Sequence, residues 1–473
     1  MITNKIDYKV YSNKPFAIWA NSRIINERLS ANSYNRDYLD FAKAKNTFNF
    51  KKVSDIAKVT AMIGWKGLTT DDYVDEDGVY LLRTVDIKDN YIDLENAVMA
   101  KREKVYEQLQ IILKQGDIIF SKDGTLGITA IVPRHQNKEM CVGSTLARIR
   151  LNSNLDNYYV CAAFMSKIVQ AQIGYFTSGI AQPHITQEYI NKLEIPIPSP
   201  EIQKYIGDKV RKAEELREEA KTLQKEIDIL LEVDMLLKEE TDKVYNIYDS
   251  KINWTNEINI EDRIDPNFYQ KKYISTIEKL GNNKVRLEKY VRITKIRYQT
   301  GNINKYIEIS SINNSFGTID EVKELRPEEI PTSAKYQVKE GDILVSLVRP
   351  TRKAISIVTK EYDNAICTGG FAVLQSKGKV PVEFLTAVLR TNFVGIQFER
   401  YCAGSTYPTI NEDDVVKVFI PMYSENQINK ITENYRRIID NIYTSKKLIE
   451  EAKQDVEDLI EGNFDMSKVK ATS

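Results

Sequence analysis

The spacing of apolar side chains predicts two long helices. From Ile428 to Leu459, apolar or small residues recur in alternating steps of three and four, with charged residues between them. This spacing, kept over several heptads, is typical of a coiled-coil seam. The run from Ile206 to Leu237 follows the same rule, with one irregular step near Ala213. The seam positions are expected to be Leu216, Leu223, Ile227 and Leu230 in the first helix, and Ile431, Tyr435, Ile438, Ile442, Ile449 and Val456 in the second.

Before each long helix lies a segment in which short apolar runs alternate with turn signals. The β-branched runs of residues 118–121 and 343–347 follow Gly-Asp pairs and are predicted to be strands. Further strands are predicted at 127–132, 146–151, 354–358 and 371–374, and one helix in each segment at 158–173 and 382–398. Proline ends the last strand of each segment, at Ile195-Pro196 and Ile420-Pro421. The pattern indicates an α+β fold.

The two segments repeat one another. The first copy has Gly116-Asp117, Cys141, Gly179, Pro183 and Gln203, and the second has Gly341-Asp342, Cys367, Gly404, Pro408 and Gln427. The offset stays at 224 to 226 residues, which indicates a duplicated domain. Upstream, Trp19, Asn21, Arg28 and Tyr34 recur at an offset of 235 as Trp254, Asn256, Arg263 and Tyr269. The first copy therefore holds about ten extra residues, which we expect in the acidic loop of residues 71–78.

Acidic and basic residues are distributed unevenly between the expected long helices and the rest of the chain. Lys plus Arg and Asp plus Glu both number 67 among the 473 residues. Residues 201–243 carry 13 acids and 9 bases, and residues 425–465 carry 10 and 6, so the remainder carries a net charge of +8. Within it, residues 284–305 hold seven bases against one acid, and Arg349, Arg352, Lys353 and Lys360 form a second cluster. Such clusters suit a phosphate backbone, although a solvated face is the alternative for either one.

The sequence offers little to support catalysis. Its four cysteines form no close pair and no Cys/His cluster at zinc spacing. Neither an amino-methyltransferase motif nor a phosphate-binding glycine loop ending in Gly-Lys-Ser/Thr is present. The two histidines, His135 and His184, both lie in expected loops, where a local hydrogen bond is the simpler role. Without a signal peptide or an apolar run of membrane length, we expect a cytoplasmic protein that binds no metal.

From Trp19 to about Gly462 the chain resembles the specificity (S) subunits of type I restriction-modification systems. The resemblance rests on the ordered set of landmarks above and on the segments Ser-Gly-Ile-Ala-Gln-Pro-His-Ile (178–185) and Ala-Gly-Ser-Thr-Tyr-Pro-Thr-Ile (403–410). It implies that each copy is a target-recognition domain and that the helices dock methyltransferase subunits, two of them by symmetry. It further implies a non-catalytic chain that selects a bipartite double-stranded DNA site. S-adenosylmethionine, ATP and Mg then belong to the methyltransferase and possible restriction partners.

The resemblance also divides the chain. We expect an N-terminal extension (1–18), a first target-recognition domain (19–200), a long helix (201–245), a second target-recognition domain (246–424), a second long helix (425–465) and a tail (466–473). The simplest symmetric arrangement packs the helices as an antiparallel coiled coil. A helix of about 40 residues spans about 60 Å, compared with about 34 to 36 Å for one turn of B-DNA.

Candidate DNA contacts are the basic, amide and hydroxyl side chains of expected loops and strand ends, because these groups pair with base edges or phosphates. They are Lys122, Arg134, Lys138, Ser178 and Gln182 in the first copy, and Arg297, Gln299, Arg349, Arg352, Lys353 and Tyr407 in the second. The segments 122–125 and 349–352 differ while the scaffold landmarks match, so we expect an asymmetric target.

Three other hypotheses stay open at this stage. The chain could be the recognition subunit of a related system whose partner fuses methyltransferase and nuclease. It could instead be a coiled-coil scaffold whose two copies bind proteins. A self-contained modification or nuclease enzyme is the third, and the missing motifs count against it.

Overall fold

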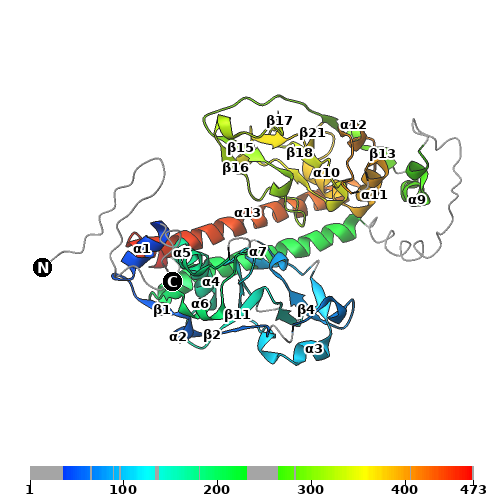
Figure 1. The fold of residues 1–473 in the computed structure, drawn as a ribbon. Helices are drawn as coiled ribbons and strands as arrows, with labels where there is room; N and C mark the ends of the chain where they lie inside the picture. Colours follow the sequence, from blue (N-terminus) through cyan, green and yellow to red (C-terminus); the bar gives the residue numbers. More distant parts are fainter. Residues whose placement is uncertain are drawn as a thin grey trace. The chain divides into compact units, whose positions relative to one another are not determined.

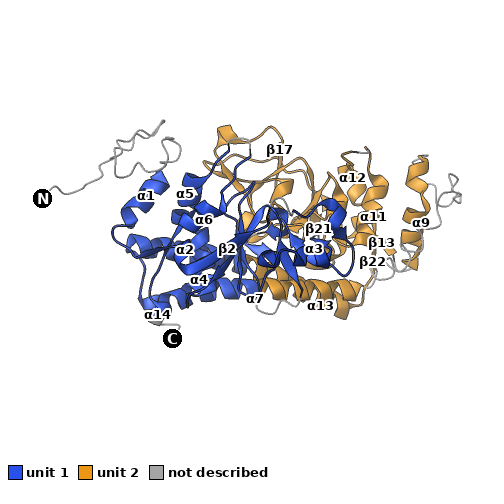
Figure 2. Ribbon diagram, turned by 60° about the horizontal axis from the view of Figure 1, so that its bottom comes forward, with its two compact units in different colours: residues 1–215, 444–473 blue, residues 216–443 orange. Residues whose placement is uncertain are grey.

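The computed structural model describes residues 36–63, 67–88, 90–94, 97–133, 138–179, 182–231, 265–281, 284–404 and 406–470. They form two compact units (Figures 1 and 2): unit 1 is Met1–Glu215 with Thr444–Ser473, and unit 2 is Leu216–Tyr443. The upstream repeat landmarks, Tyr269 excepted, lie outside the described residues. Within the described part, no helix is long and apolar enough to cross a membrane.

Unit 1 is built on a four-stranded antiparallel sheet in the order β2-β11-β8-β9, formed by Ala57–Ala61, Leu146–Leu151, Ile118–Ser121 and Thr129–Ile131. A second sheet has the order β10-β4-β7-β3, formed by Met140–Val142, Val79–Leu82, Val98–Ala100 and Tyr73–Val74. Two strand pairs are β1 (Phe50–Lys52) with β12 (Glu194–Pro196), and β5 (Ile87–Lys88) with β6 (Tyr91–Ile92). The helices are α1 (Arg36–Ala44), α2 (Val53–Ile56), α3 (Arg102–Tyr106), α4 (Asn157–Met165), α5 (Lys167–Phe176), α6 (Gln187–Lys192) and α14 (Ser467–Lys470).

Unit 2 repeats the topology of the first sheet and the parallel strand pair of the second. Its antiparallel sheet has the order β14-β21-β18-β19, formed by Val291–Ile293, Phe371–Ser376, Ile343–Ser346 and Ile355–Ile357. The second sheet has the order β16-β15-β20-β17, formed by Lys323–Leu325, Asn304–Ile307, Ile366–Thr368 and Ala334–Gln337. β13 (Lys284–Arg286) pairs with β22 (Phe419–Pro421), as β1 does with β12. The helices are α9 (Lys271–Glu278), α10 (Val382–Leu389), α11 (Asn392–Tyr401) and α12 (Glu412–Val415).

Strand registers locate the extra residues of the first copy. Ala57 pairs with Leu151 as Val291 pairs with Ser376, so β2 and β14 correspond at an offset of 234 residues. Tyr80 pairs with Met140 as Tyr306 pairs with Ile366, so β4 and β15 correspond at an offset of 226. The additional residues therefore lie between β2 and β4, in the stretch that contains the acidic loop. They add the edge strand β3, which pairs with β7.

Each apolar helix expected as a single element is two helices. The expected helix 158–173 is divided into α4 and α5 at Ser166, and the expected helix 382–398 into α10 and α11 at Arg390 and Thr391. Ser166 (φ −66°, ψ 150°) and Thr391 (φ −70°, ψ 153°) are extended, and the Thr391 hydroxyl accepts a hydrogen bond from the Val394 N–H at 3.3 Å. The prediction of unbroken helices was wrong because a Ser or Thr N-cap starts a new helix without interrupting the apolar pattern.

The long helices are α7 (Pro200–Leu231) and α13 (Glu425–Glu461). In unit 1 the first part of α7 and the last part of α13 share a hydrophobic core, and Lys209 forms an ion pair with Asp455 at 2.6 Å. In unit 2 the remaining parts share a second core, and the Asn434 amide donates to Glu226 at 3.0 Å. Each long helix is therefore packed within the core of both units.

The structure buries the expected seam positions, except Leu230. That residue is half-buried, while its neighbour Leu231 is buried. Near the end of α13 the expected Leu459 is likewise half-buried and Ile460 is buried. A straight α-helix has 3.6 residues per turn, so its buried face drifts by about one position from a strict 3.5-residue repeat over a few heptads.

A buried glutamine in each unit fixes the strand that leads into the long helix. The Gln172 amide donates to the Glu194 carbonyl at 2.9 Å and accepts from the Glu194 N–H at 2.8 Å. Gln397 makes the same pair of bonds to Phe419, at 2.8 and 2.7 Å. Both glutamines are 1% exposed. Because β12 and β22 directly precede α7 and α13, these amides hold each helix to the unit from which it emerges.

We expect Gln397→Ala to loosen β22 locally. It leaves the Phe419 N–H and carbonyl without these partners, and an unpaired buried polar group costs about 1–3 kcal/mol. Hydrogen exchange of peptides covering residues 415–424 should therefore accelerate, and Gln172→Ala should do the same around Glu194. The control is Gln454→Ala, since Gln454 is exposed and its amide donates to the Asp458 carboxylate within α13. Unchanged exchange at Phe419 would contradict this role.

Candidate nucleic-acid interface

A tight loop in unit 1 is closed by the backbone. Ser178 and His184 exchange two hydrogen bonds, of 2.9 and 2.8 Å between N–H and carbonyl. Gly179 begins the loop at φ +83°, and a Cβ atom at this position would lie 2.5 Å from the Gln182 carbonyl oxygen. The glycine is therefore needed both for its left-handed conformation and for the close approach of the backbone.

This loop docks against the end of β8. The Lys122 carbonyl accepts from the Ile185 N–H at 2.9 Å, and the Gly124 N–H donates to the Pro183 carbonyl at 3.0 Å. The structure thus brings three sequence-predicted residues, Lys122, Ser178 and Gln182, to one pair of loops. The Gln182 side chain is exposed.

Unit 2 builds the same pair of loops. Ala403 and Thr409 exchange hydrogen bonds of 2.8 and 2.9 Å, and Gly404 has φ +86°. The Ile410 N–H donates to the Leu347 carbonyl at 2.9 Å, as Ile185 does to Lys122 in unit 1. In both units the loop is positioned by main-chain atoms, so its side chains are not required to hold it.

The side chains on these loops differ between the units. In unit 1 the Lys122 ammonium lies 2.5 Å from the Asp123 carboxylate. In unit 2 the Arg349 guanidinium lies over the Tyr407 ring, 4.5 Å from its centroid, and donates to the Thr406 carbonyl at 3.1 Å. Tyr407 is 66% exposed. A cation–π contact at an exposed site contributes about 0.5–1 kcal/mol, and here it fixes a cation on an aromatic platform facing solvent.

Three residues of the second basic cluster, Arg349, Arg352 and Lys353, lie in one turn beside this ring, which we call the basic turn (Arg349–Lys353), whereas Lys360 lies on η13 (Lys360–Tyr362). A short 3₁₀ helix, η12 (Pro350–Arg352), forms its centre. Arg349 (φ 47°) and Lys353 (φ 60°) flank it, both left-handed. Arg352 is exposed and Lys353 half-buried. Left-handed backbone at two non-glycine residues is strained and is commonly found at functional sites.

Several predicted contacts lie on other elements. The Lys138 ammonium bonds the Tyr80 hydroxyl at 3.2 Å, beside the β10-β4 pair. Arg297 forms a backbone bridge with Tyr336, and its side chain, like that of Gln299, is exposed. Arg134 lies outside the described residues.

The basic run 284–305 is not one patch. Lys284 and Arg286 lie over the Phe419 ring, and Lys295 forms an ion pair with Glu412 at 2.7 Å. Burial acts to raise the pKa of the Glu412 carboxyl, but hydrogen bonds from Lys295, Tyr336 and Lys335 outweigh it and lower the pKa. These cations are already engaged by aromatic rings or a carboxylate, so a count of charges along the sequence overstates what this run offers a ligand.

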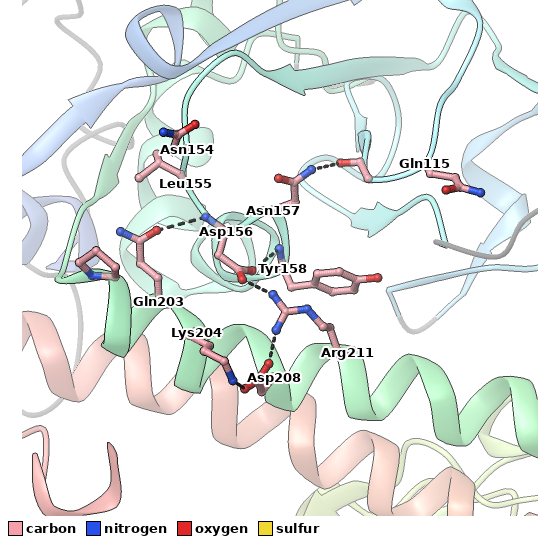
Figure 3. A pocket seen from close by; sticks show the side chains of 12 residues that line it. Gln115, Asn154, Leu155, Asp156, Asn157, Tyr158, Gln203, Lys204, Asp208 and Arg211 are labelled. Atoms are coloured by element: carbon pink, nitrogen blue, oxygen red, sulfur yellow. Dashed lines mark hydrogen bonds and ion pairs between the residues drawn. The ribbon is translucent and has the colours of Figure 1, made fainter. Parts of the chain in front are cut away.

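A polar hollow of about 1010 Å³ lies beside α7 in unit 1 (Figure 3). Asp156 caps α4 by accepting from the Tyr158 and Tyr159 N–H groups at 2.9 and 3.0 Å. Its carboxylate also forms an ion pair with Arg211 of α7, and the Arg211 guanidinium lies over the Tyr158 ring at 4.7 Å. These groups pair mainly with one another, so we interpret them as a brace between α4 and α7.

Metal binding and thiol reactivity depend on the His, Cys, Asp and Glu side chains among the residues that the structure describes. No group of three or more His, Cys, Asp or Glu side chains among them could hold a metal ion. Burial raises the pKa of the Cys141, Cys161 and Cys367 thiols to about 12, and that of Cys402 to about 11. These thiols are therefore protonated at neutral pH and are poor nucleophiles.

Two groups that contribute to this site were not predicted from the sequence. The Thr406 carbonyl anchors Arg349, and no sequence pattern marks a carbonyl acceptor. The buried Arg390, 6% exposed, bonds the Lys353 carbonyl at 2.8 Å. In the sequence, Arg390 is a lone arginine within an apolar helical run. Such a position indicates a buried cation with specific partners.

Comparisons with known proteins identify the fold of the first copy. Residues 45–228 match the type I restriction modification DNA specificity domain. The HindI type I restriction enzyme specificity subunit of Haemophilus influenzae is 26% identical over 150 residues, which are 30% of this chain and 33% of that protein. The chain thus aligns with about a third of the length of that relative.

Two solved structures align over most of both chains. The type I restriction-modification S subunit of M. genitalium is 14% identical, covering 89% of this chain and 97% of that one, with a TM-score of 0.41. The HsdS subunit of Thermoanaerobacter tengcongensis is 14% identical, covering 88% and 97%, with a TM-score of 0.30. Residues 45–228 are thus similar to the type I restriction modification DNA specificity domain, and 150 residues of the chain are similar to a type I restriction enzyme specificity subunit.

Proposed function

We propose that this chain is the non-catalytic subunit that selects an asymmetric, bipartite double-stranded DNA target for methyltransferase and restriction subunits. The observation that carries the proposal is the repeated loop pair: the same backbone in both units presents different polar side chains. Such a duplicated scaffold suits two half-sites of different sequence. The curated relative named a specificity subunit supports the same assignment.

Each unit would recognise one half-site through its loop pair. In the first domain (19–200) the candidates are Lys122, Ser178 and Gln182. In the second (246–424) they are the basic turn and Tyr407. Arginine can donate two hydrogen bonds to guanine, and glutamine can pair with adenine, so these side chains are chemically able to discriminate bases.

The long helices (201–245 and 425–465) would pack as an antiparallel coiled coil that sets the distance between half-sites. Contacts within unit 2 support this direction. The Tyr423 hydroxyl donates to the Leu231 carbonyl at 2.7 Å, while Asn434 meets Glu226 further back along α7. The 37 residues of α13 correspond to about 55 Å of helix, or about one and a half turns of B-DNA.

The helices would also carry the partners. Two methyltransferase subunits fit the twofold repeat, and restriction subunits could join them. S-adenosylmethionine, ATP and Mg would be bound by those subunits. The described residues of this chain offer no cluster that could hold a metal ion.

Methylome sequencing tests the proposal directly. The chain is co-expressed with its neighbouring methyltransferase gene, and methylated sites are compared with those made by the methyltransferase alone. We expect a bipartite adenine-methylated motif that appears only when both chains are present. DNA binding by the complex should weaken steeply with salt, because phosphate contacts release counterions. If no such motif appears and the complex binds DNA without salt dependence, a protein-binding scaffold is favoured instead.

We expect Arg349→Ala to relax the second half-site alone. Loss of a bidentate base contact costs about 1–3 kcal/mol, or about 5- to 150-fold in discrimination at one base pair. The methylome of the variant complex should keep the first half-site unchanged.

The matched control is Arg437→Ala, which removes an equal charge from unit 2 at an exposed ion pair with Glu219 on the helices. Surface pairs of this kind contribute about 0–1 kcal/mol, so its methylated motif should match that of the unaltered chain. An unchanged motif for Arg349→Ala would remove Arg349 from the contact set.

A further inference from the structure

The basic turn needs a support that its own sequence does not supply. Arg349 and Lys353 are both left-handed, a conformation that β-carbons disfavour. In unit 1 the corresponding segment contains Gly124 and Gly127, both at φ +77°, which adopt positive φ without strain. The basic turn of unit 2 has no glycine, so tertiary contacts must hold it.

Arg390 provides such contacts. One guanidinium nitrogen, Nη1, donates to the Lys353 carbonyl at 2.8 Å and to the Ile355 carbonyl at 3.2 Å. The other, Nη2, donates to the Asn314 and Ser315 carbonyls at 2.8 and 2.9 Å. The side chain is 6% exposed. A planar guanidinium can hold two loops at once in this way because its donors diverge in fixed directions.

The second loop held by Arg390 is itself anchored. The Tyr435 hydroxyl of α13 donates to the Phe316 carbonyl at 3.3 Å. Gly317 (φ +71°) lets the chain pass close by: an added Cβ would lie 2.8 Å from Arg390 Nη1 and 2.5 Å from the Tyr435 hydroxyl. The basic turn is therefore connected to the long helix through Arg390 and residues 314–317.

Unit 1 has no arginine at the matching position. Ser166 and Thr391 occupy matching helix breaks, so the residue that corresponds to Arg390 is Met165. There the Gln170 amide holds the loop, donating to the Gly127 carbonyl, which matches that of Lys353, at 3.0 Å. The two units thus stabilise equivalent loops by different means.

We infer that Arg390 is a positioning residue for recognition of the second half-site. It holds the Lys353 end of the basic turn, and so keeps Arg349 over Tyr407 in the orientation that presents it to DNA. This inference rests on the proposed function. It assigns specificity to a buried side chain that does not touch DNA.

The test compares two variants of the clamp with one matched control, each in the full complex with methyltransferase. Arg390→Lys keeps the charge but cannot span four carbonyl oxygens. Gly317→Ala keeps the arginine at position 390, but the added methyl group displaces its guanidinium by steric contact. Arg400→Lys is the control, because Arg400 is also 6% exposed and bonds a backbone carbonyl that is not part of the basic turn, that of Phe268 at 2.9 Å.

We expect both clamp variants to reduce base discrimination at the second half-site by about tenfold, within the range for a weakened bidentate contact. The first half-site should stay unchanged in the methylome. Arg400→Lys should lower the thermal unfolding midpoint of the complex by about as much as the two clamp variants do. It should not relax discrimination at either half-site.

Two results would overturn the inference. One is full discrimination at the second half-site in folded Arg390→Lys and Gly317→Ala complexes. The other is equal relaxation by Arg400→Lys, which would mean that general loss of stability causes the effect. Both differ from failure of the proposed function, in which the unaltered complex would give no bipartite motif at all.

Discussion

The candidate interface depends on one constraint: main-chain hydrogen bonds pair a glycine loop with the end of the central strand in each unit. Ser178 with His184, and Ala403 with Thr409, close the loops, while Ile185 and Ile410 attach them to β8 and β18. All of these bonds use backbone atoms, so any residue with a compatible φ and ψ can make them. The geometry is retained while the exposed side chains change.

The last strand of each unit is also held through its backbone atoms. Gln172 and Gln397 bond the backbone of β12 and β22, so strand side chains are free to face their own core. Only the glutamines themselves are constrained, since a buried N–H or carbonyl without a partner is costly. The exits into α7 and α13 are thereby equivalent in the two units although the helices differ in nearly all their surface residues.

The sequence predicted the strands well where they are continuous and buried. Residues 118–121 and 146–151 were predicted with the bounds of β8 and β11, because β-branched runs between turn signals leave few alternatives. The helix breaks at Ser166 and Thr391 were missed because apolar spacing continues across them. A single Ser or Thr is a weaker sign of a helix boundary than the long periodic pattern is of a continuous helix.

The site was only partly predictable for a related reason. Lys122 and Gln182 meet through loop pairing, and the repeated glycine pointed to that loop. Nothing in the sequence distinguished Arg349, which lies on an exposed ring, from Lys295, which is bound to a carboxylate. Charge counts along a chain do not contain the partner of each charge, and the partner decides whether a cation is available to a ligand.

These contrasts separate two kinds of position in each unit. Substitutions at Gln182 or Tyr407 alter the presented chemistry without disturbing the backbone that holds the loop. Substitutions at Gly179 or Arg390 alter the backbone itself, and with it every side chain on the loop. Because the units use different supports, glycine and the Gln170 amide in one and the Arg390 guanidinium in the other, a change in one support leaves the other unit's loop intact. On the proposed function, this independence lets a single chain recognise two half-sites separately.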